Sequence, residues 1–195
     1  VFIVGMPRTG TTLLINLLAQ DDLFRCLMRW EADDLIPPKA MEASSSDPRI
    51  AKRKKSEEQA KITPHFEQFQ DPAECYHILS QDFKCVSLEH PVDNPPYREW
   101  LYSTSKVSAY QHHKRVLQLL QQYRSGRWLL KLPSHVLNLD EILQVYPDAM
   151  FVTLHRNPIQ AAASYVSLTQ KSLTSRTHKL LDSKALGAQL MPQLY

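Results

Sequence analysis

The sequence predicts an α/β fold, a three-layer sandwich in which helices cover both faces of a central parallel sheet. Short apolar runs, typical of strands buried on both faces, alternate along the chain with amphipathic helical segments. Two of only four glycines bracket the loop after the first apolar run. Alternation of this kind implies right-handed crossovers between parallel strands, with ligands bound at the carboxyl ends of those strands. The candidate site residues are therefore sought at the strand ends.

The expected elements follow from hydrophobic spacing. The predicted strands are residues 1–4, 128–130 and 150–154, and the predicted helices are residues 11–20, 110–123 and 136–146. Leu13 and Leu17 share one face of the first helix, and Leu143 is expected to point inward from the last. Residues 44–61 are polar and carry a KRKK run, which predicts a solvated helix or mobile segment.

Length and composition indicate one globular domain, residues 1–195, with 43% apolar and 22% charged residues. The chain starts on a strand and stops in a helix-like run, so we expect truncation at one or both ends. A net charge of +3 gives no indication of a nucleic-acid partner. The three cysteines lack metal-ligand spacing, and the absence of a long apolar run predicts no membrane span. The compartment stays open, with the cytoplasm weakly favoured.

The loop between the first strand and the first helix reads GMPRTGTT over residues 5–12. Backbone N–H groups in such a loop and at the following helix start form a cradle for anions. The spacing equals that of the P-loop, GxxxxGK[ST], and predicts a P-loop NTPase-like fold. However, Thr11 stands where the P-loop has lysine, and no apolar run ends in an obvious metal-binding aspartate. A magnesium triphosphate is therefore a poor fit, and the positive charge is supplied by Arg8.

The run PRTGTTL, residues 7–13, resembles the PKSGTT or PRSGTT loop of the sulfotransferase superfamily. Members transfer a sulfuryl group from 3′-phosphoadenosine 5′-phosphosulfate (PAPS) to an acceptor. The resemblance implies that the 5′-phosphosulfate is held by Arg8, Thr9, Gly10, Thr11 and Thr12. A phosphosulfate needs no metal ion, and a planar guanidinium suits its charged oxygens.

A second motif strengthens the resemblance. The predicted strand over residues 150–154 leads into HRNP, residues 155–158, and Ser164 follows eight residues after Arg156. A strand ending in arginine and a proline-started helix carrying a serine can aim both groups at one phosphate. In sulfotransferases an arginine and a serine at this spacing bind the 3′-phosphate of PAPS, a role that the resemblance assigns to Arg156 and Ser164. The glycine-rich segment of cytosolic sulfotransferases is not visible, which leaves the adenine contacts open.

Three residues are catalytic candidates. Glu31 follows the first helix, in a region where some sulfotransferases carry their carboxylate base. His135 is its rival, because cytosolic members place a histidine base just after a lysine, although here the spacing is two residues longer. Lys131 ends an apolar strand, where an ammonium is costly unless it faces a ligand, and is assigned to the bridging oxygen of the donor.

The sequence therefore favours a PAPS-dependent sulfotransferase that acts in line and without a metal on a hydroxyl or amine. Two alternatives are a P-loop kinase or nucleotide-binding protein with a degenerate Walker A loop, and a non-catalytic nucleotide-binding domain. The acceptor stays open among carbohydrate, lipid, small phenol and peptide tyrosine. Aromatic residues that could line its pocket are Tyr76, Phe83, Tyr97, Trp100 and Tyr102.

Overall fold

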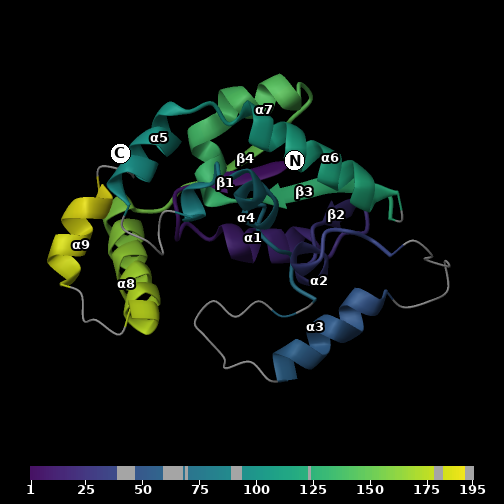
Figure 1. Cartoon of the computed structure of the whole chain (residues 1–195), viewed down its shortest axis with the longest axis horizontal. Coiled ribbons are helices and arrows are strands. Elements are labelled where there is room, and N and C mark those ends of the chain that lie inside the picture. Colours follow the sequence, from purple (N-terminus) through teal and green to yellow (C-terminus); the bar gives the residue numbers. More distant parts are fainter. Residues whose placement is uncertain are drawn as a thin grey trace.

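The computed structural model describes residues 1–38, 47–58, 68, 70–88, 94–122, 124–177 and 182–191. At the centre lies a parallel sheet of four strands in the order β2-β3-β1-β4 (Figure 1). The strands are β1 Phe2–Gly5, β2 Phe24–Cys26, β3 Arg127–Lys131 and β4 Phe151–Leu154. The α/β class and the three predicted strands are confirmed.

The sequence prediction missed β2, which forms one edge of the sheet. It has only three residues, and Arg25 in the middle interrupts the apolar pattern that identifies a buried strand. Nevertheless Arg25 is 1% exposed, because its guanidinium forms an ion pair with Glu31 inside the protein. A tertiary contact therefore stabilises a strand that local hydrophobicity does not indicate.

Helices flank the sheet on both sides (Figure 1). Within the described residues they are α1 Thr11–Leu18, α2 Arg29–Asp33, α3 Pro48–Glu58, α4 Tyr76–Leu79, α5 Pro95–Ser103, α6 Val107–Gln121, α7 Leu139–Val145, α8 Pro158–Thr177 and α9 Ser183–Leu190. Three short 3-10 helices are η1 Ser80–Asp82, η2 Val86–Leu88 and η3 Pro133–Asn138. The helix predicted over residues 136–146 is thus divided, because a proline-started 3-10 turn precedes α7. The polar segment at 44–61 contains α3, preceded by the described residue Asp47, and residues 44–46 and 59–61 of this segment lie outside the described residues.

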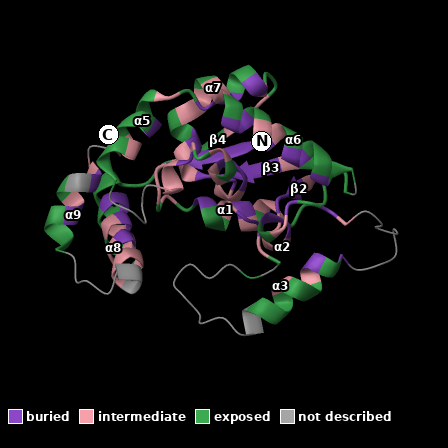
Figure 2. Ribbon diagram, viewed as in Figure 1, coloured by how far each residue is buried: buried purple, intermediate pink, exposed green. Residues whose placement is uncertain are grey.

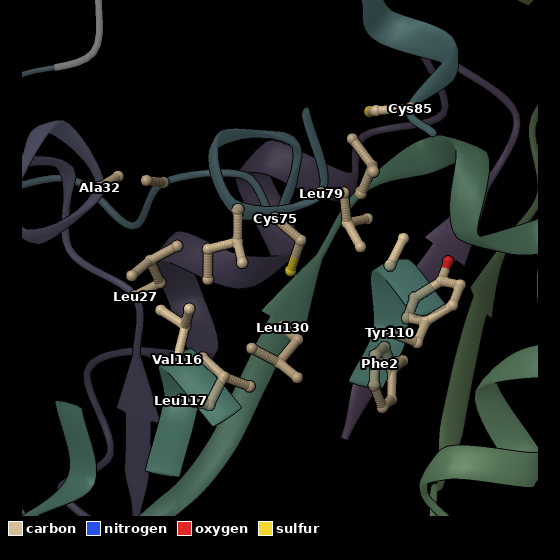
Figure 3. Close-up of a cluster of buried hydrophobic side chains, with 14 of the residues drawn as sticks. Phe2, Leu27, Ala32, Cys75, Leu79, Cys85, Tyr110, Val116, Leu117 and Leu130 are labelled. Carbon is tan, nitrogen blue, oxygen red and sulfur yellow. The ribbon is translucent and has the colours of Figure 1, made fainter. Parts of the chain in front are cut away.

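Each face of the sheet has its own apolar core. On one face, Phe2 and Val4 of β1 and Leu130 of β3 pack with side chains of α4, α6 and α7 (Figure 3). On the other face, Ile3 and Leu129 pack against Ile15 of α1. Consecutive residues of β1 point to opposite faces, so burial on both sides requires the continuous apolar run that the sequence shows (Figure 2).

The side-chain orientations in α1 and α7 depend on which helical face packs against the sheet. Leu13 and Leu17 share one face of α1, but this face is exposed, at 66% and 61%, whereas Thr11 and Ile15 are buried. Leu143 of α7 is 41% exposed instead of pointing inward. Helical spacing identifies a shared face but does not say which face packs against the sheet, and in α1 two faces carry leucine or isoleucine.

Two buried histidines lie in the core between β1 and the helices α6 and α7. His135 Nδ1 and the Tyr110 hydroxyl share a hydrogen bond of 2.8 Å, and His113 Nδ1 and the Tyr146 hydroxyl share one of 2.7 Å. Burial lowers the pKa of His113 to about 3 and that of His135 well below its usual value. Both imidazoles are therefore neutral at pH 7, and each tyrosine satisfies one ring nitrogen.

None of the helices in the described residues combines the length and the apolar character needed to cross a membrane.

Acid should destabilise the fold through His113. The unfolded chain takes up a proton near pH 6.5 whereas the folded chain does so only near pH 3, so stability falls as the pH decreases between these values. Between roughly pH 7.5 and pH 5, His113 should lower the free energy of unfolding by about 2 kcal/mol. Urea unfolding at several pH values across this range measures this change. His113→Phe should show a shallower acid dependence than the parent protein, and equal slopes would contradict the assignment.

Gly5→Ala should destabilise the end of β1. A Cβ at this position would lie 2.8 Å from the Leu154 carbonyl oxygen and 3.2 Å from Thr9 Oγ1, at a backbone φ of +145°. We expect a loss of about 1–3 kcal/mol in the free energy of unfolding, measured in urea. Gly187→Ala is the matched control, because its Cβ would meet only Val166 Cγ2, at 3.8 Å. If both variants unfold alike, the close approach of β1 and β4 is not what requires Gly5.

Candidate active site

The loop after β1 has the geometry of an anion cradle. The first bond within α1 runs from Leu14 N to Gly10 O, at 3.1 Å. The N–H groups of Thr11 and Thr12 therefore have no acceptor within the helix. Gly10 adopts a left-handed conformation at φ 101°, and Thr9 Oγ1 donates to the Met6 carbonyl at 2.8 Å, which holds the turn. The start of α1 thus offers N–H donors and the positive end of a helix to an anion.

Arg8 connects this loop to the second motif. Its backbone has a φ of 69°, unusual for a residue other than glycine, and its Nε donates to Ser164 Oγ on α8 at 3.1 Å. In return, Arg156 Nη1 donates to the Arg8 carbonyl at 3.1 Å. Arg8 and Arg156 are both exposed, so their charges are available to a ligand. Two motifs separated by nearly the whole chain therefore meet at one place.

Lys131 lies at the carboxyl end of β3 and reaches the start of α1. Its Nζ donates to Thr12 Oγ1 at 3.1 Å and to Glu74 Oε1 at 2.5 Å, while its side chain is only 2% exposed. The buried ammonium thus contacts Thr12, the second residue of α1. The carboxylate of Glu74 balances its charge, and the Glu74 side chain remains 24% exposed.

Sequence analysis did not identify Glu74. It precedes the short helix α4, in a segment without strand or helix periodicity, and lies 57 residues from Lys131 in the chain. No spacing rule connects the two positions. Only the fold shows that the carboxylate lies beside the predicted lysine.

The other two catalytic candidates occupy different surroundings. Both carboxylate oxygens of Glu31 accept from Arg25, at 2.8 and 2.5 Å, and one also accepts from Met28 N at 3.0 Å. The Arg25 guanidinium lies 4.5 Å from the centre of the Trp128 ring. His135 is fully buried beside Tyr110 in the core. Glu31 and His135 therefore both have partners inside the protein.

A cavity of about 420 Å³ opens beside the loop. Its lining is Met6, Pro7, Arg8, Thr12, Glu74, Tyr76, Val86, Ser87, Tyr102, Leu132, Pro133, Ser134, Val136, Leu137, Tyr165, Leu168, Thr169, Ser172 and Leu173. The loop and Glu74 contribute charged and hydroxyl groups, and η2, α5, η3 and α8 contribute apolar side chains together with serine, threonine and tyrosine hydroxyls. Glu31 and His135 do not belong to this lining, whereas Tyr76 and Tyr102 of the expected aromatic residues do.

The described residues contain no cluster of three histidine, cysteine, aspartate or glutamate side chains that could hold a metal ion. The cysteines are buried, and burial raises the pKa of the Cys26 thiol to about 11 and that of Cys75 to about 12. These two thiols are therefore protonated at neutral pH. The groups in the described cavity that can do chemistry are the loop donors, Arg8, Glu74 and, behind Thr12, Lys131.

Comparison with solved structures identifies sulfotransferases of the same fold. The crystal structure of sulfotransferase STF9 from Mycobacterium avium superposes with a TM-score of 0.87 at 35% identity, covering 100% of this chain and 52% of that chain. STF1 from Mycobacterium tuberculosis gives a TM-score of 0.84 at 32% identity, covering 98% and 54%. The P-loop NTPase-like fold is thereby confirmed.

Curated relatives are also named as sulfotransferases. The omega-hydroxy-beta-dihydromenaquinone-9 sulfotransferase Stf3 of Mycobacterium bovis is 27% identical over 177 residues, which are 86% of this chain and 44% of that protein. The chain thus spans about half the length of the relatives that it matches. The sequence model of the sulfotransferase family matches residues 1–193. With both the family model and the solved structures in agreement, the chain belongs to the sulfotransferase family.

Proposed function

We propose that this protein transfers the sulfuryl group of PAPS to a hydroxyl of its acceptor, without a metal ion. The observation that carries the proposal is the joining of two anion-binding motifs, in which Arg8 contacts Ser164 and Arg156 contacts the Arg8 carbonyl. PAPS has charge at both places, on its 5′-phosphosulfate and on its 3′-phosphate. The loop and the start of α1 are assigned to the first, and Arg156 with Ser164 to the second.

Lys131 is assigned to the leaving group. As the acceptor oxygen bonds to sulfur, the bond from sulfur to the bridging oxygen breaks, and its electron pair stays on adenosine 3′,5′-bisphosphate. An ammonium held at the start of α1 can donate to the oxygen that gains this charge. The contact with Thr12 keeps Lys131 at that position. Being almost completely buried, the ammonium exerts its charge with little screening by water.

Glu74 is the carboxylate best placed to accept the acceptor's proton. It lines the cavity and is held beside Lys131, whereas the carboxylate of Glu31 is occupied by Arg25 and Met28 N. The Glu74 side chain is 24% exposed and lines the cavity, so that a hydroxyl bound there could approach its carboxylate. The proton then moves from the acceptor hydroxyl to Glu74 and from there to solvent. We therefore prefer Glu74 to Glu31 and His135 as the base.

Binding of adenosine 3′,5′-bisphosphate tests the donor assignment. In calorimetry with EDTA present, we expect tight binding that weakens at least tenfold in Arg156→Ala, because a guanidinium–phosphate contact is lost. ATP with and without Mg²⁺ is the comparison ligand. Arg115→Ala, an exposed arginine on α6, is the matched control and should bind like the parent protein.

Two outcomes would favour the alternatives. Binding of ATP that requires Mg²⁺, with none of the bisphosphate, would support a kinase or nucleotide hydrolase. Binding of the bisphosphate without turnover of PAPS by any acceptor would support a non-catalytic nucleotide-binding domain. Arg156→Ala with unchanged affinity would contradict the assignment of the 3′-phosphate to this residue.

Glu74→Gln and Glu31→Gln separate the two candidate bases. Glu74→Gln should lower the rate of PAPS turnover by about 10²–10⁴ while the bisphosphate still binds. Glu31→Gln should instead lower the free energy of unfolding by about 3 kcal/mol, because it leaves the buried Arg25 without its charge partner. Turnover per bound donor should stay near the parent value. Loss of turnover in Glu31→Gln at full donor binding would restore Glu31 as the base.

A further inference from the structure

The cavity beside the donor loop has two unlike parts. Arg8, Thr12 and Glu74 form the part next to the loop, and the remaining wall combines apolar side chains with uncharged hydroxyl groups from other elements. Among the described lining residues, Arg8 and Glu74 are the side chains charged at neutral pH. Both have partners, because Arg8 donates to Ser164 and Glu74 accepts from Lys131.

The apolar wall includes large side chains that are open to solvent. Tyr102 of α5 is 44% exposed, and Val136 and Leu137 of η3 are 36% and 51% exposed. Leu168 and Leu173 of α8 line the same cavity and are half-buried. Exposed apolar side chains that converge on a concave site are typical of a ligand-binding pocket, because a ligand removes them from water.

The local structure of η3 explains why two of these side chains point into the cavity. The 3-10 turn starts at Pro133 and places His135 in the core beneath it, where the ring bonds to Tyr110. The next two residues, Val136 and Leu137, then face the cavity. Burial of His135 therefore orients the apolar part of the wall.

Resting on the proposed function, we propose that the acceptor is a hydroxyl carried on an extended apolar body, a long-chain or aromatic alcohol. Its body packs on Tyr102, Val136 and Leu137, and its hydroxyl reaches Glu74 beside the loop. The Glu74 carboxylate takes the hydroxyl proton as the acceptor oxygen bonds to sulfur, and the bisphosphate leaves with the electrons of the broken sulfur–oxygen bond.

A carbohydrate or peptide acceptor fits this wall poorly. Each additional hydroxyl, amide or charge that enters an apolar pocket must lose water and find a new partner. The charged groups of the cavity, Arg8 and Glu74, lie next to the loop, whereas the rest of the described lining carries uncharged hydroxyl groups beside its apolar side chains. Apolar surface on the acceptor, in contrast, gains from leaving water in proportion to its area.

A graded series of acceptors tests the proposal. Turnover of PAPS is measured with linear primary alcohols from butanol to dodecanol, with phenol, with glucose and with a tyrosine-containing peptide. We expect kcat/KM to rise at least tenfold from the shortest to the longest alcohol, with glucose and the peptide below both. Leu137→Asp should remove most of this rise by raising KM for dodecanol, with little effect on butanol.

The controls distinguish this inference from the proposed function. Leu143→Asp changes another exposed leucine, 41% against 51% for Leu137, that lies outside the cavity lining, and should behave like the parent protein. Leu137→Ala, a milder variant, should show an intermediate effect if Leu137→Asp folds poorly. Binding of adenosine 3′,5′-bisphosphate should be unchanged in all three variants, which shows that the donor site is intact.

Each outcome decides one question. If the bisphosphate does not bind the parent protein, the proposed function fails. If it binds but glucose or the peptide is the better acceptor, or turnover is independent of alcohol length, only the apolar acceptor is refuted. If no acceptor is turned over, calorimetric titration of dodecanol into the bisphosphate complex tests whether the apolar site binds the alcohol. Absence of dodecanol binding in that titration refutes the apolar acceptor site.

Discussion

The contact of Lys131 with Thr12 and Glu74 is the interaction around which the candidate site is arranged. It joins the carboxyl end of β3, the start of α1 and the segment before α4, three pieces that are remote in sequence. A buried ammonium requires a partner, and Glu74 supplies it at the border of the cavity. The same requirement that stabilises the lysine inside the protein thus delivers a carboxylate to the place where an acceptor can approach.

The parts of the fold that could be predicted are those with a local signal. Apolar runs identified β1 and β3, since strands covered on both faces need continuous hydrophobic sequence, and also β4, although Val152 and Thr153 of this edge strand are exposed. The edge strand β2 could not be recognised, because Arg25 is buried only through its ion pair with Glu31. Which face of α1 packs on the sheet also depended on tertiary contacts. Hydrophobic patterns in the sequence thus identify a strand or helix, but they do not show which other elements it packs against.

The candidate site shows the same division. The glycine spacing of the loop and the HRNP segment fixed the residues of the donor motifs, and the fold brings Arg8, Arg156 and Ser164 together. The acid-base group was harder to place, because a carboxylate's role depends on what surrounds it. The linear sequence singled out Glu31 and not Glu74, yet Glu31 neutralises a buried guanidinium and Glu74 borders the cavity. Only the fold shows this difference in their surroundings.

The close approach of the Gly5 backbone to Leu154 affects how the loop and the HRNP segment are placed relative to each other. Because a Cβ there would lie 2.8 Å from the Leu154 carbonyl oxygen, β1 and β4 touch through main chain alone where both strands end. The pairing of β1 with β4 extends to Gly5 and Leu154, so the main-chain contact of the two strands positions the starts of the loop and of the HRNP segment next to each other. A larger residue at position 5 would therefore act on both segments together, through the backbone that carries them.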